Sequence, residues 1–428
     1  MNDKFLQRLA LRLPDYSAYE KCLSEPPCKG IRVNTLKISA QDFARIAPFP
    51  LRPVAWEENG FFIDEEKPGR YLYHDAGLYY VQEPSAMCAA PLLDVQPGER
   101  VLDLCSAPGG KGTQLAQKMC GEGIIVLNEK IPDRARILLQ NAERLGIRNA
   151  VVTCADPAAL AERLPAYFDK ILVDAPCSGE GMFRKEPEAA RQWSEETVAM
   201  CADRQKKILA SAAKMLAPGG KLVYSTCTFA EEEDEENAAW FVREFPQFSL
   251  VKQVKLWPHR TEGEGHFAAL FCREDGEKIS HRQERPAADK RAVALWRSFA
   301  REFLKQPFAE DCTLLSFKNT LYAAPIGLFP LAGLRVLAAG VRLGEAVQAG
   351  KTARFEPAHA LVMAEERGQF AYTAPLSEEE ARRYLRGEEL PGSSVNGWCA
   401  VTFEGRPLGL AKGAGGALKN HYPKGLRH

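Results

Sequence analysis

The sequence predicts an α/β protein built around an open, doubly wound parallel sheet. Between positions 101 and 274, short apolar runs alternate with segments of helical periodicity, a pattern typical of repeated strand–helix–strand units. The apolar run 101–104 is followed by Pro108, Gly109 and Gly110 and then by a helical pattern. A strand, a glycine turn and a helix in this order form a ligand crevice at the carboxyl edge of such a sheet. We therefore expect a ligand-binding domain in the middle of the chain.

Five strands are expected to form the parallel part of this sheet. They lie at residues 101–104, 124–128, 150–154, 170–174 and 221–225. Helices are expected between them, the clearest at 133–145 and 204–216, each of which a glycine or proline ends. Two further apolar runs, 248–251 and 266–272, are expected to close the sheet as a pair of strands.

The segment before the sheet combines helical and extended patterns. Residues 5–13 predict a helix that a proline ends, and alternation over 31–36 predicts a strand that places Arg32 and Asn34 on one face. A further helix is expected from Ser85, a residue typical of a helix start, up to the next proline-glycine turn.

The segment beyond the sheet has a weaker α+β pattern. A charged stretch at 275–290 is expected to be a linker. Two strands about a glycine turn are expected within 334–344, and a hairpin with its turn at Glu404 and Gly405 is expected within 397–409.

Composition bounds the possible functions. With 428 residues, of which 46% are hydrophobic and 26% charged, the chain is typical of a multidomain globular protein. No apolar run reaches the roughly 18 residues that a membrane helix needs, and the first residues lack a signal peptide's apolar segment. The twelve cysteines show no zinc-ligand spacing, so we expect no metal site and free thiols in a reducing cytoplasm.

Charge is balanced, with 56 basic and 56 acidic residues. The chain as a whole therefore does not attract nucleic acid, and any polyanion would have to be held by local patches. One such patch is the carboxyl-terminal stretch 412–428, which contains Lys412, Lys419, Lys424 and Arg427 but no acid.

Three ligands commonly use a glycine turn of this kind. The dinucleotide fingerprint needs Gly-x-Gly-x-x-Gly, which residues 106–111 do not supply. The phosphate-binding loop of nucleotide triphosphatases needs a glycine at its first position and a Ser or Thr after its lysine. This chain has Cys105 at the first position and Gly112 at the last. The remaining common ligand is S-adenosylmethionine, and the alternative is a tight turn without a ligand.

Three acids follow successive strands and are expected to meet the glycine turn in one crevice. Glu129 lies about twenty residues past the turn, where a carboxylate grips ribose hydroxyls. Asp156 is placed to accept from an adenine amino group, although an acid before a proline also caps a helix. Asp174 would face the cationic methionine end, and Asp103, inside the first strand, is expected to orient the turn.

Two cysteines also end strands at this edge, Cys177 after the fourth strand and Cys227 after the fifth. A thiolate beside a methyl donor suits methylation of carbon 5 of a pyrimidine, because that carbon becomes nucleophilic only after a thiolate adds to carbon 6. A second cysteine would act as base or assist release. The acid run 231–236 is expected to be a solvated first helical turn.

Three motifs at these positions resemble one family. Leu104-Cys-Ser-Ala-Pro-Gly-Gly-Lys111, Asp174-Ala-Pro-Cys-Ser-Gly179 and Ser225-Thr-Cys-Thr-Phe229 are similar to the signature motifs of the Sun-type RNA cytosine-5 methyltransferases. The resemblance implies that Cys227 is the attacking nucleophile and that Cys177 assists release of the product. It also implies that contacts with S-adenosylmethionine fall on Cys105, Ser106, Ala107, Pro108, Gly109, Gly110, Lys111, Glu129, Arg134, Asp156 and Asp174.

The ends of the chain extend the resemblance. Residues 31–37 resemble the family's amino-terminal RNA-binding segment. Residues 333–344 and 397–427 are similar to the RsmF (YebU) branch, which carries a PUA-like domain and methylates a cytosine of small-subunit ribosomal RNA. Ser106 departs from the alanine that is common in the family, and this small change puts little in doubt.

The resemblance implies a Rossmann-like S-adenosylmethionine-dependent methyltransferase core with flanking α+β regions. An N-terminal RNA-binding domain is expected at 1–95 and the catalytic domain at 96–275. A linker and pre-PUA region is expected at 276–365, and a PUA-like RNA-binding domain at 366–428.

The function expected from this resemblance is methylation of carbon 5 of a cytosine in RNA, with 16S ribosomal RNA the favoured substrate. The enzyme would be a cytoplasmic monomer that uses S-adenosylmethionine and no metal and binds no membrane. Its partner would be ribosomal RNA or a small-subunit particle, contacted by the cationic tail and Arg32 with salt-dependent affinity. The alternatives are a transfer RNA substrate and an inactive RNA-binding assembly factor.

Overall fold

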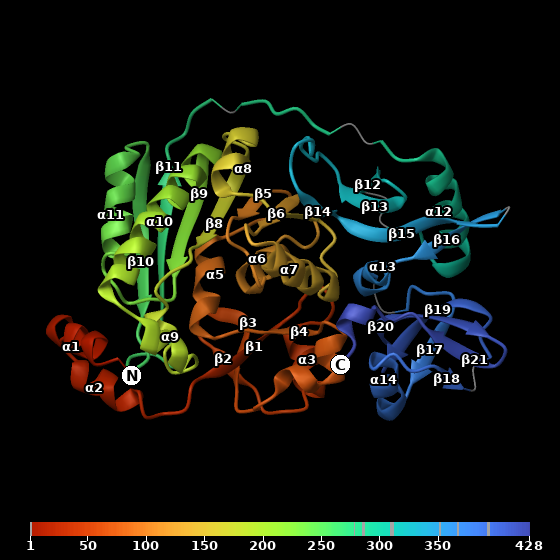
Figure 1. The fold of residues 1–428 in the computed structure, drawn as a ribbon, viewed down its shortest axis with the longest axis horizontal. Helices are drawn as coiled ribbons and strands as arrows, with labels where there is room; N and C mark the ends of the chain where they lie inside the picture. Colours follow the sequence, from red (N-terminus) through yellow and green to blue (C-terminus); the bar gives the residue numbers. More distant parts are fainter. Residues whose placement is uncertain are drawn as a thin grey trace.

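The residues that the computed structural model describes form four β-sheets (Figure 1). The structure describes residues 2–277, 279–284, 287–308, 312–350, 352–365, 368–391 and 394–428. Helices cover both faces of the eight-stranded central sheet. The amino-terminal sheet lies below it in this view, and the two carboxyl-terminal sheets lie to its right.

The central sheet is the predicted doubly wound α/β sheet, with strand order β10-β11-β9-β8-β5-β6-β7-β14. Its parallel strands are β5 (Arg100–Asp103), β6 (Ile124–Asn128), β7 (Ala150–Thr153), β8 (Phe168–Asp174) and β9 (Leu216–Thr226). The expected closing pair is also confirmed, because β10 (Phe248–Leu256) and β11 (His266–Arg273) pair antiparallel at one edge.

Two hydrophobic cores lie on the two faces of this sheet. The core that contains Val173 and Tyr224 lies beneath α8 (Pro157–Arg163), α10 (Glu195–Met215) and α11 (Glu235–Glu244). The core that contains Leu172 and Val223 lies beneath α5 (Ala89–Leu93), α6 (Gly110–Lys118) and α7 (Pro132–Arg144). Because side chains alternate along a strand, residues two apart share a face.

The amino-terminal part forms a four-stranded sheet of order β2-β3-β1-β4 with four helices. Its elements are α1 (Asp3–Arg12), α2 (Tyr16–Cys22), β1 (Lys29–Val33), α3 (Ala40–Ile46), β2 (Arg52–Val54), β3 (Glu57–Ile63), η1 (Pro68–Arg70), α4 (Leu72–Asp75) and β4 (Tyr79–Val81). The helix and strand expected here from periodicity are confirmed as α1 and β1.

The helix expected to start at Ser85 differs from the prediction. A 3₁₀ turn, η2 (Ser85–Cys88), precedes the short helix α5, and Asp94 ends that helix in a left-handed conformation with φ 52°. Ser85 does not cap it, because its hydroxyl donates to the Glu83 carboxylate and accepts from the Gly265 amide. Ser85 thus links the segment between β4 and α5 to Gly265, the residue that precedes β11.

The carboxyl-terminal part forms two smaller sheets. The first, of order β12-β13-β15-β16, consists of β12 (Cys312–Phe317), β13 (Thr320–Pro325), β15 (Val341–Ala349) and β16 (Thr352–Pro357), with α12 (Lys290–Phe303) and α13 (His359–Ala364). The second, of order β17-β19-β20-β21-β18, consists of β17 (Thr373–Leu376), β18 (Leu390–Pro391), β19 (Gly397–Phe403), β20 (Arg406–Ala414) and β21 (Ala417–Asn420), with α14 (Glu378–Leu385) and η4 (Lys424–Leu426). The predicted hairpin is confirmed as β19 and β20, with Glu404 and Gly405 at its turn.

The segment between β11 and α12 contains no helix or strand among its described residues, as expected of a linker, and positions 278, 285 and 286 of it lie outside them. Within the described parts of the chain, no helix is long and apolar enough to cross a membrane.

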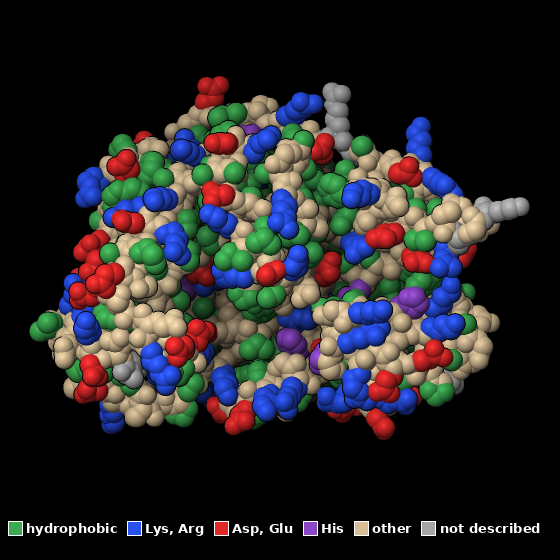
Figure 2. Space-filling view, viewed as in Figure 1, with side chains coloured by type: hydrophobic (Ala, Val, Ile, Leu, Met, Phe, Trp, Pro, Cys, Tyr) green, Lys and Arg blue, Asp and Glu red, His purple; other side chains and the backbone are tan. Residues whose placement is uncertain are grey.

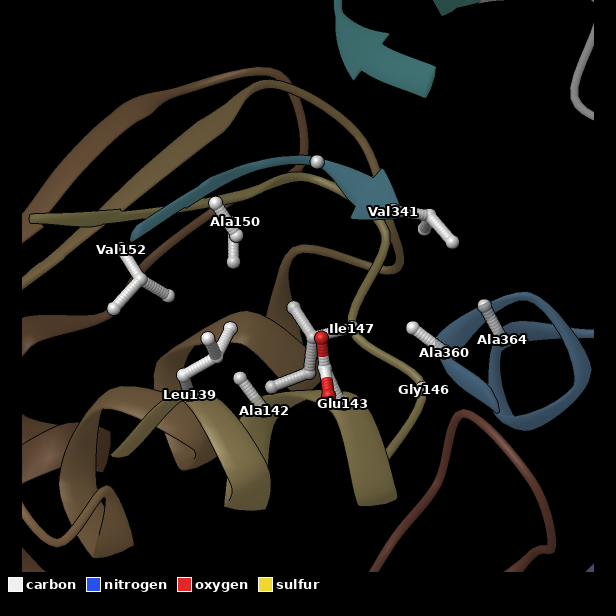
Figure 3. Close-up of a pocket in the computed structure, with 12 residues that line it drawn as sticks. Leu139, Ala142, Glu143, Gly146, Ile147, Ala150, Val152, Val341, Ala360 and Ala364 are labelled. Carbon is white, nitrogen blue, oxygen red and sulfur yellow. The ribbon is translucent and has the colours of Figure 1, made fainter. Parts of the chain in front are cut away.

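The two strands expected about a glycine turn exist as β14 (Val336–Ala339) and β15, with Gly340 between them. They belong to different sheets, because β14 pairs antiparallel with β7 at the edge of the central sheet. Figure 3 shows the place where this strand and α13 approach α7. The hollow left between them has a volume of about 10 Å³, room for roughly one water molecule, so the contact is closely packed.

Glu143 of α7 lines this hollow, and burial raises its pKa to about 7, against an opposing effect of Arg342. The folded state therefore favours the protonated carboxyl, and its ionisation lowers stability as pH rises from the ordinary pKa of 4.5 to about 7. Glu143→Gln should raise the free energy of unfolding by about 2 kcal/mol at pH 8 and by little at pH 4.5, measured by urea denaturation. The exposed Glu188→Gln should show no such difference, and an equal effect of Glu143→Gln at both pH values would contradict the assignment.

Candidate active site

The glycine turn connects β5 to α6 and wraps around the end of the strand. Gly109 has φ 115°, a left-handed conformation that favours glycine, and Gly110 begins the helix. A Cβ on Gly112 would lie 2.5 Å from the Ser106 hydroxyl and 2.7 Å from the Asp103 carboxylate. Because Gly112 has no side chain, the first turn of α6 can pack directly against the end of β5.

Arg32 holds this helix from the amino-terminal sheet. Its guanidinium donates to the Gln117 side chain at 3.0 Å, to the Thr113 hydroxyl at 2.7 Å and to the Gly110 carbonyl at 2.6 Å. The side chain is fully buried, so the expectation that Arg32 contacts RNA is wrong. The alternation of residues 31–36 did place Arg32 and Asn34 on one face, but that face packs on α6, where Asn34 accepts from Gln117.

Asp103 and Ser106 leave polar atoms free beneath the turn. Both carboxylate oxygens of Asp103 and the Ser106 hydroxyl are buried, and within the described part of the chain none of them makes a hydrogen bond of good geometry. Burial raises the pKa of Asp103 to about 7, against an opposing effect of the nearby Ser106 hydroxyl. Such orphaned atoms fit a polar ligand that donates to them, as an ammonium group does.

Glu129 and Arg134 lie beside the glycine turn, past the end of β6. Glu129 is 5% exposed, accepts from the Ile131 amide at 2.9 Å and lies 3.3 Å from the Arg134 guanidinium. Arg134 also donates to the Ala107 carbonyl at 2.7 Å. The arginine therefore fixes the glycine turn and the carboxylate relative to each other, which is a positioning contact.

Asp156 occupies the end of β7 and caps α8. Its side chain accepts from the Ala158 amide at 2.9 Å and pairs with the Lys130 ammonium at 2.7 Å. These two partners, Lys130 first, lower the pKa of Asp156. The helix-capping alternative raised from the sequence is therefore present in the structure, at an exposed position.

Lys111 and Asp174 connect the glycine turn to the end of β8. The Lys111 ammonium lies 2.9 Å from one Asp174 oxygen, and the Ser225 hydroxyl donates to the other at 2.9 Å. The lysine side chain is 9% exposed. Burial works against its charge, but Asp174 outweighs burial and the pKa of Lys111 lies above its ordinary value.

Cys177 and Cys227 meet beyond the ends of β8 and β9. Their sulfur atoms lie 3.2 Å apart, and both residues are half-buried. The contact with Cys227, followed by burial, raises the pKa of the Cys177 thiol well above its ordinary range. Beside them, the Ser178 and Thr228 hydroxyls are 2.8 Å apart, and the Gly181 amide donates to the Cys227 carbonyl. The strand ends therefore bring the two predicted cysteines together.

The acid run 231–236 is not the solvated turn that its composition predicts. Glu233 and Asp234 are fully buried, and the helix α11 begins only at Glu235. Glu233 accepts from the Ser178 amide at 3.0 Å, and Asp234 pairs with the Lys255 ammonium at 2.9 Å. Sequence reasoning missed these buried acids because their partners lie far away along the chain.

Basic and acidic side chains are interspersed over the face shown in Figure 2, with basic groups gathered at the lower right, over the last sheet. On α14 Arg382 pairs with Glu378, and just past the end of that helix Arg386 pairs with Glu388. In the predicted cationic tail, Lys419 and Lys424 are exposed.

Four family models match the chain one after another. Residues 1–84 match the N-terminal domain of 16S rRNA methyltransferase RsmF, and 90–272 match 16S rRNA methyltransferase RsmB/F. Residues 298–364 match the RsmF rRNA methyltransferase first C-terminal domain, and 371–428 match the methyltransferase RsmF PUA domain.

Curated relatives match over almost the whole chain. The ribosomal RNA small subunit methyltransferase F of Escherichia coli O17:K52:H18 (strain UMN026 / ExPEC) is 33% identical over 99% of this chain and 96% of its own length. The protein of the same name from Escherichia fergusonii is also 33% identical over the same shares.

Solved structures share the fold. A methyltransferase homolog protein from Pyrococcus horikoshii is 28% identical, with a TM-score of 0.56 over 64% of this chain and 100% of its own. NSun6 from Pyrococcus horikoshii, at 21% identity, has a TM-score of 0.57 over 64% of this chain and 97% of its own.

The strand order, the glycine turn beyond β5 and these likenesses define a Rossmann-like methyltransferase. The family models that match the amino-terminal and carboxyl-terminal parts identify the kind of methyltransferase more closely, because all three describe domains of RsmF. The chain belongs to the RsmF family of RNA methyltransferases, which confirms the resemblance found in its motifs.

Proposed function

We propose that this protein transfers a methyl group from S-adenosylmethionine to carbon 5 of a cytosine in small-subunit ribosomal RNA, through a covalent bond from Cys227. The observation that carries the proposal is the pair of sulfur atoms 3.2 Å apart at the ends of β8 and β9. The name of the curated relatives, ribosomal RNA small subunit methyltransferase F, supports this choice of RNA.

The residues of the crevice fit the methyl donor. When bound, S-adenosylmethionine supplies an electrophilic methyl group. The orphaned oxygens of Asp103 and the Ser106 hydroxyl suit its ammonium end, and the buried Glu129 carboxylate suits its ribose hydroxyls. Main-chain atoms of the turn, from Cys105 to Lys111, would pack along it, Asp156 would lie toward the adenine, and Asp174 toward the methionine end. Arg134 would act by holding Glu129 and the turn.

Cys227 would act as the nucleophile. Its thiolate sulfur bonds to carbon 6 of the cytosine, and the displaced electron pair makes carbon 5 nucleophilic. Carbon 5 then bonds to the methyl carbon as the bond from that carbon to the sulfonium sulfur breaks, and the electron pair of the broken bond stays on that sulfur, so that S-adenosylhomocysteine leaves. The proton on carbon 5 leaves to a base or to water, its electron pair re-forms the double bond between carbons 5 and 6, and the bond from sulfur to carbon 6 breaks.

Cys177 would assist the last step. The contact with Cys227 raises the pKa of Cys177, so this thiol keeps its proton and is placed to donate it in a hydrogen bond to the Cys227 sulfur. Such a hydrogen bond strengthens as negative charge returns to Cys227 and so favours its departure from the base.

RNA binding would rest on local patches because the net charge is zero. The exposed Lys419 and Lys424 of the tail are candidates for phosphate contacts, with affinity that falls as salt rises. The target base must be unpaired or flipped from its stack for the Cys227 sulfur to reach carbon 6. Comparing small ribosomal subunits with transfer RNA as substrates would separate the two RNA classes.

The Cys177→Ala variant should accumulate a covalent protein–RNA adduct when S-adenosylmethionine is present, because the departing Cys227 thiolate loses its hydrogen-bond donor. The adduct is measured as a band of lower mobility on a denaturing gel. The Cys227→Ala variant and the double variant should form none, and Cys201→Ala, a buried cysteine elsewhere, should behave as the unmodified enzyme. An adduct that persists without the Cys227 thiol would reverse the assigned roles.

The Glu129→Gln variant should weaken binding of S-adenosylmethionine by about 10-fold, because a charged hydrogen-bond acceptor typically contributes more than 1 kcal/mol. Calorimetric titration measures the affinity. Asp133→Asn, which removes an exposed carboxylate from the first turn of α7, four residues further along the chain, serves as the matched control. Equal affinities of the two variants for S-adenosylmethionine would contradict a hydrogen bond from its ribose hydroxyls to Glu129.

A further inference from the structure

His266 is a buried polar side chain that the chemistry above leaves without a role. It is the first residue of β11 and is 1% exposed. Neither ring nitrogen has a hydrogen-bond partner among the residues that the structure describes. A buried polar group without a partner lowers stability, and such groups are rare in folded proteins. A ligand that supplies the partner would account for this position.

The register of the sheet places His266 beside Cys227. Phe267 of β11 pairs with Thr226 of β9, and one step further along the two strands lie His266 and Cys227. Gly181 packs against both segments, because a Cβ there would lie 3.0 Å from the carbonyl oxygen of Cys227 and 3.0 Å from that of Gly265. The backbone that carries the histidine is therefore next to the backbone that carries the nucleophile.

Alternation along the strands puts both side chains on one face of the sheet. His266 lies two residues before Ala268, which belongs to the core beneath α5, α6 and α7. Cys227 lies four residues after Val223, which belongs to the same core. Because residues two apart share a face, His266 and Cys227 share this one.

Asp174 and Lys111 lie on that face as well. Asp174 follows Leu172 of the same core by two residues, and Lys111 belongs to α6, which covers it. Burial first, and the Lys111 ammonium second, lower the pKa of His266 well below its ordinary value. The imidazole is therefore neutral and offers one N–H donor and one lone pair.

We propose that His266 binds the base that Cys227 attacks, by donating one ring N–H to the O2 carbonyl of the pyrimidine. The inference rests on the proposed function, because it needs a pyrimidine over Cys227. β8, β9 and β11 are neighbours in the sheet, and neighbouring strands lie about 4.8 Å apart. Asp174 and His266 thus lie on the two strands that flank the strand of Cys227, and His266 is placed as a donor for a carbonyl of the base.

This contact would act in the addition step. When the Cys227 sulfur bonds to carbon 6, the π electrons between carbons 5 and 6 move into the ring, and the charge is shared by carbon 5, N3 and O2. A donor already in place at O2 stabilises that charge as it develops, an effect of about 100-fold in rate for one donor in a water-poor site. No proton is transferred in this step, so a neutral histidine is sufficient.

The test measures the rate of adduct formation in the Cys177→Ala background with S-adenosylmethionine and small-subunit ribosomal RNA. His266→Phe keeps a flat ring of similar size without hydrogen bonding and should slow the adduct by about 100-fold. His266→Gln restores a side-chain N–H donor and should recover at least part of that loss. His74→Phe, at a half-buried histidine of α4, should leave the rate unchanged.

Thermal melting and calorimetric donor binding separate this contact from a packing role, since the proposal expects both to stay near the unmodified values in His266→Gln. Where His266→Phe fails to fold, His266→Leu takes its place. The inference is overturned if the folded His266→Phe or His266→Leu variant forms the adduct as fast as the parent. It is also overturned if His266→Gln forms the adduct as slowly as that apolar variant. Absence of any adduct with His266 intact would instead count against the proposed function.

Discussion

The ion pair between the buried Lys111 and the half-buried Asp174 is the interaction on which the arrangement of the site depends. It joins the first turn of α6 to the end of β8, so the glycine turn and the Pro-Cys segment cannot shift independently. Removing the Asp174 carboxylate would leave the buried Lys111 charge without its partner, a change that typically costs about 3–5 kcal/mol. Arg32 extends the same frame by holding α6 from the amino-terminal sheet. The glycine turn, the two cysteines and the amino-terminal sheet are therefore positioned as one unit.

The features that could be predicted from sequence are those that local patterns determine. Apolar runs located the five parallel strands, and the turn residues after them located the loop and both cysteines. Because parallel strands end at the same edge of a sheet, this was enough to bring Lys111, Glu129 and Cys227 to one edge of it. For Asp156 the sequence left two interpretations open, a contact with adenine and a helix cap, and the structure shows the cap on α8.

The features that sequence could not supply depend on partners far along the chain. A run of acids looks solvated unless one knows that Ser178 and Lys255 reach Glu233 and Asp234. Arg32 was expected to contact RNA, whereas its buried guanidinium donates to Gln117 and Thr113 of α6, about eighty residues further along the chain. His266 was likewise hidden, since only the pairing of β11 with β9 places it beside Cys227.

Addition of Cys227 to carbon 6 is the central claim, and the fate of the hydrogen on carbon 5 tests it most directly. Small-subunit ribosomal RNA labelled with tritium at carbon 5 of cytosine would be incubated with the enzyme and S-adenosylmethionine. The account predicts one tritium released to water for each methyl group transferred, and no release by Cys227→Ala. Methyl transfer without release of tritium would contradict it.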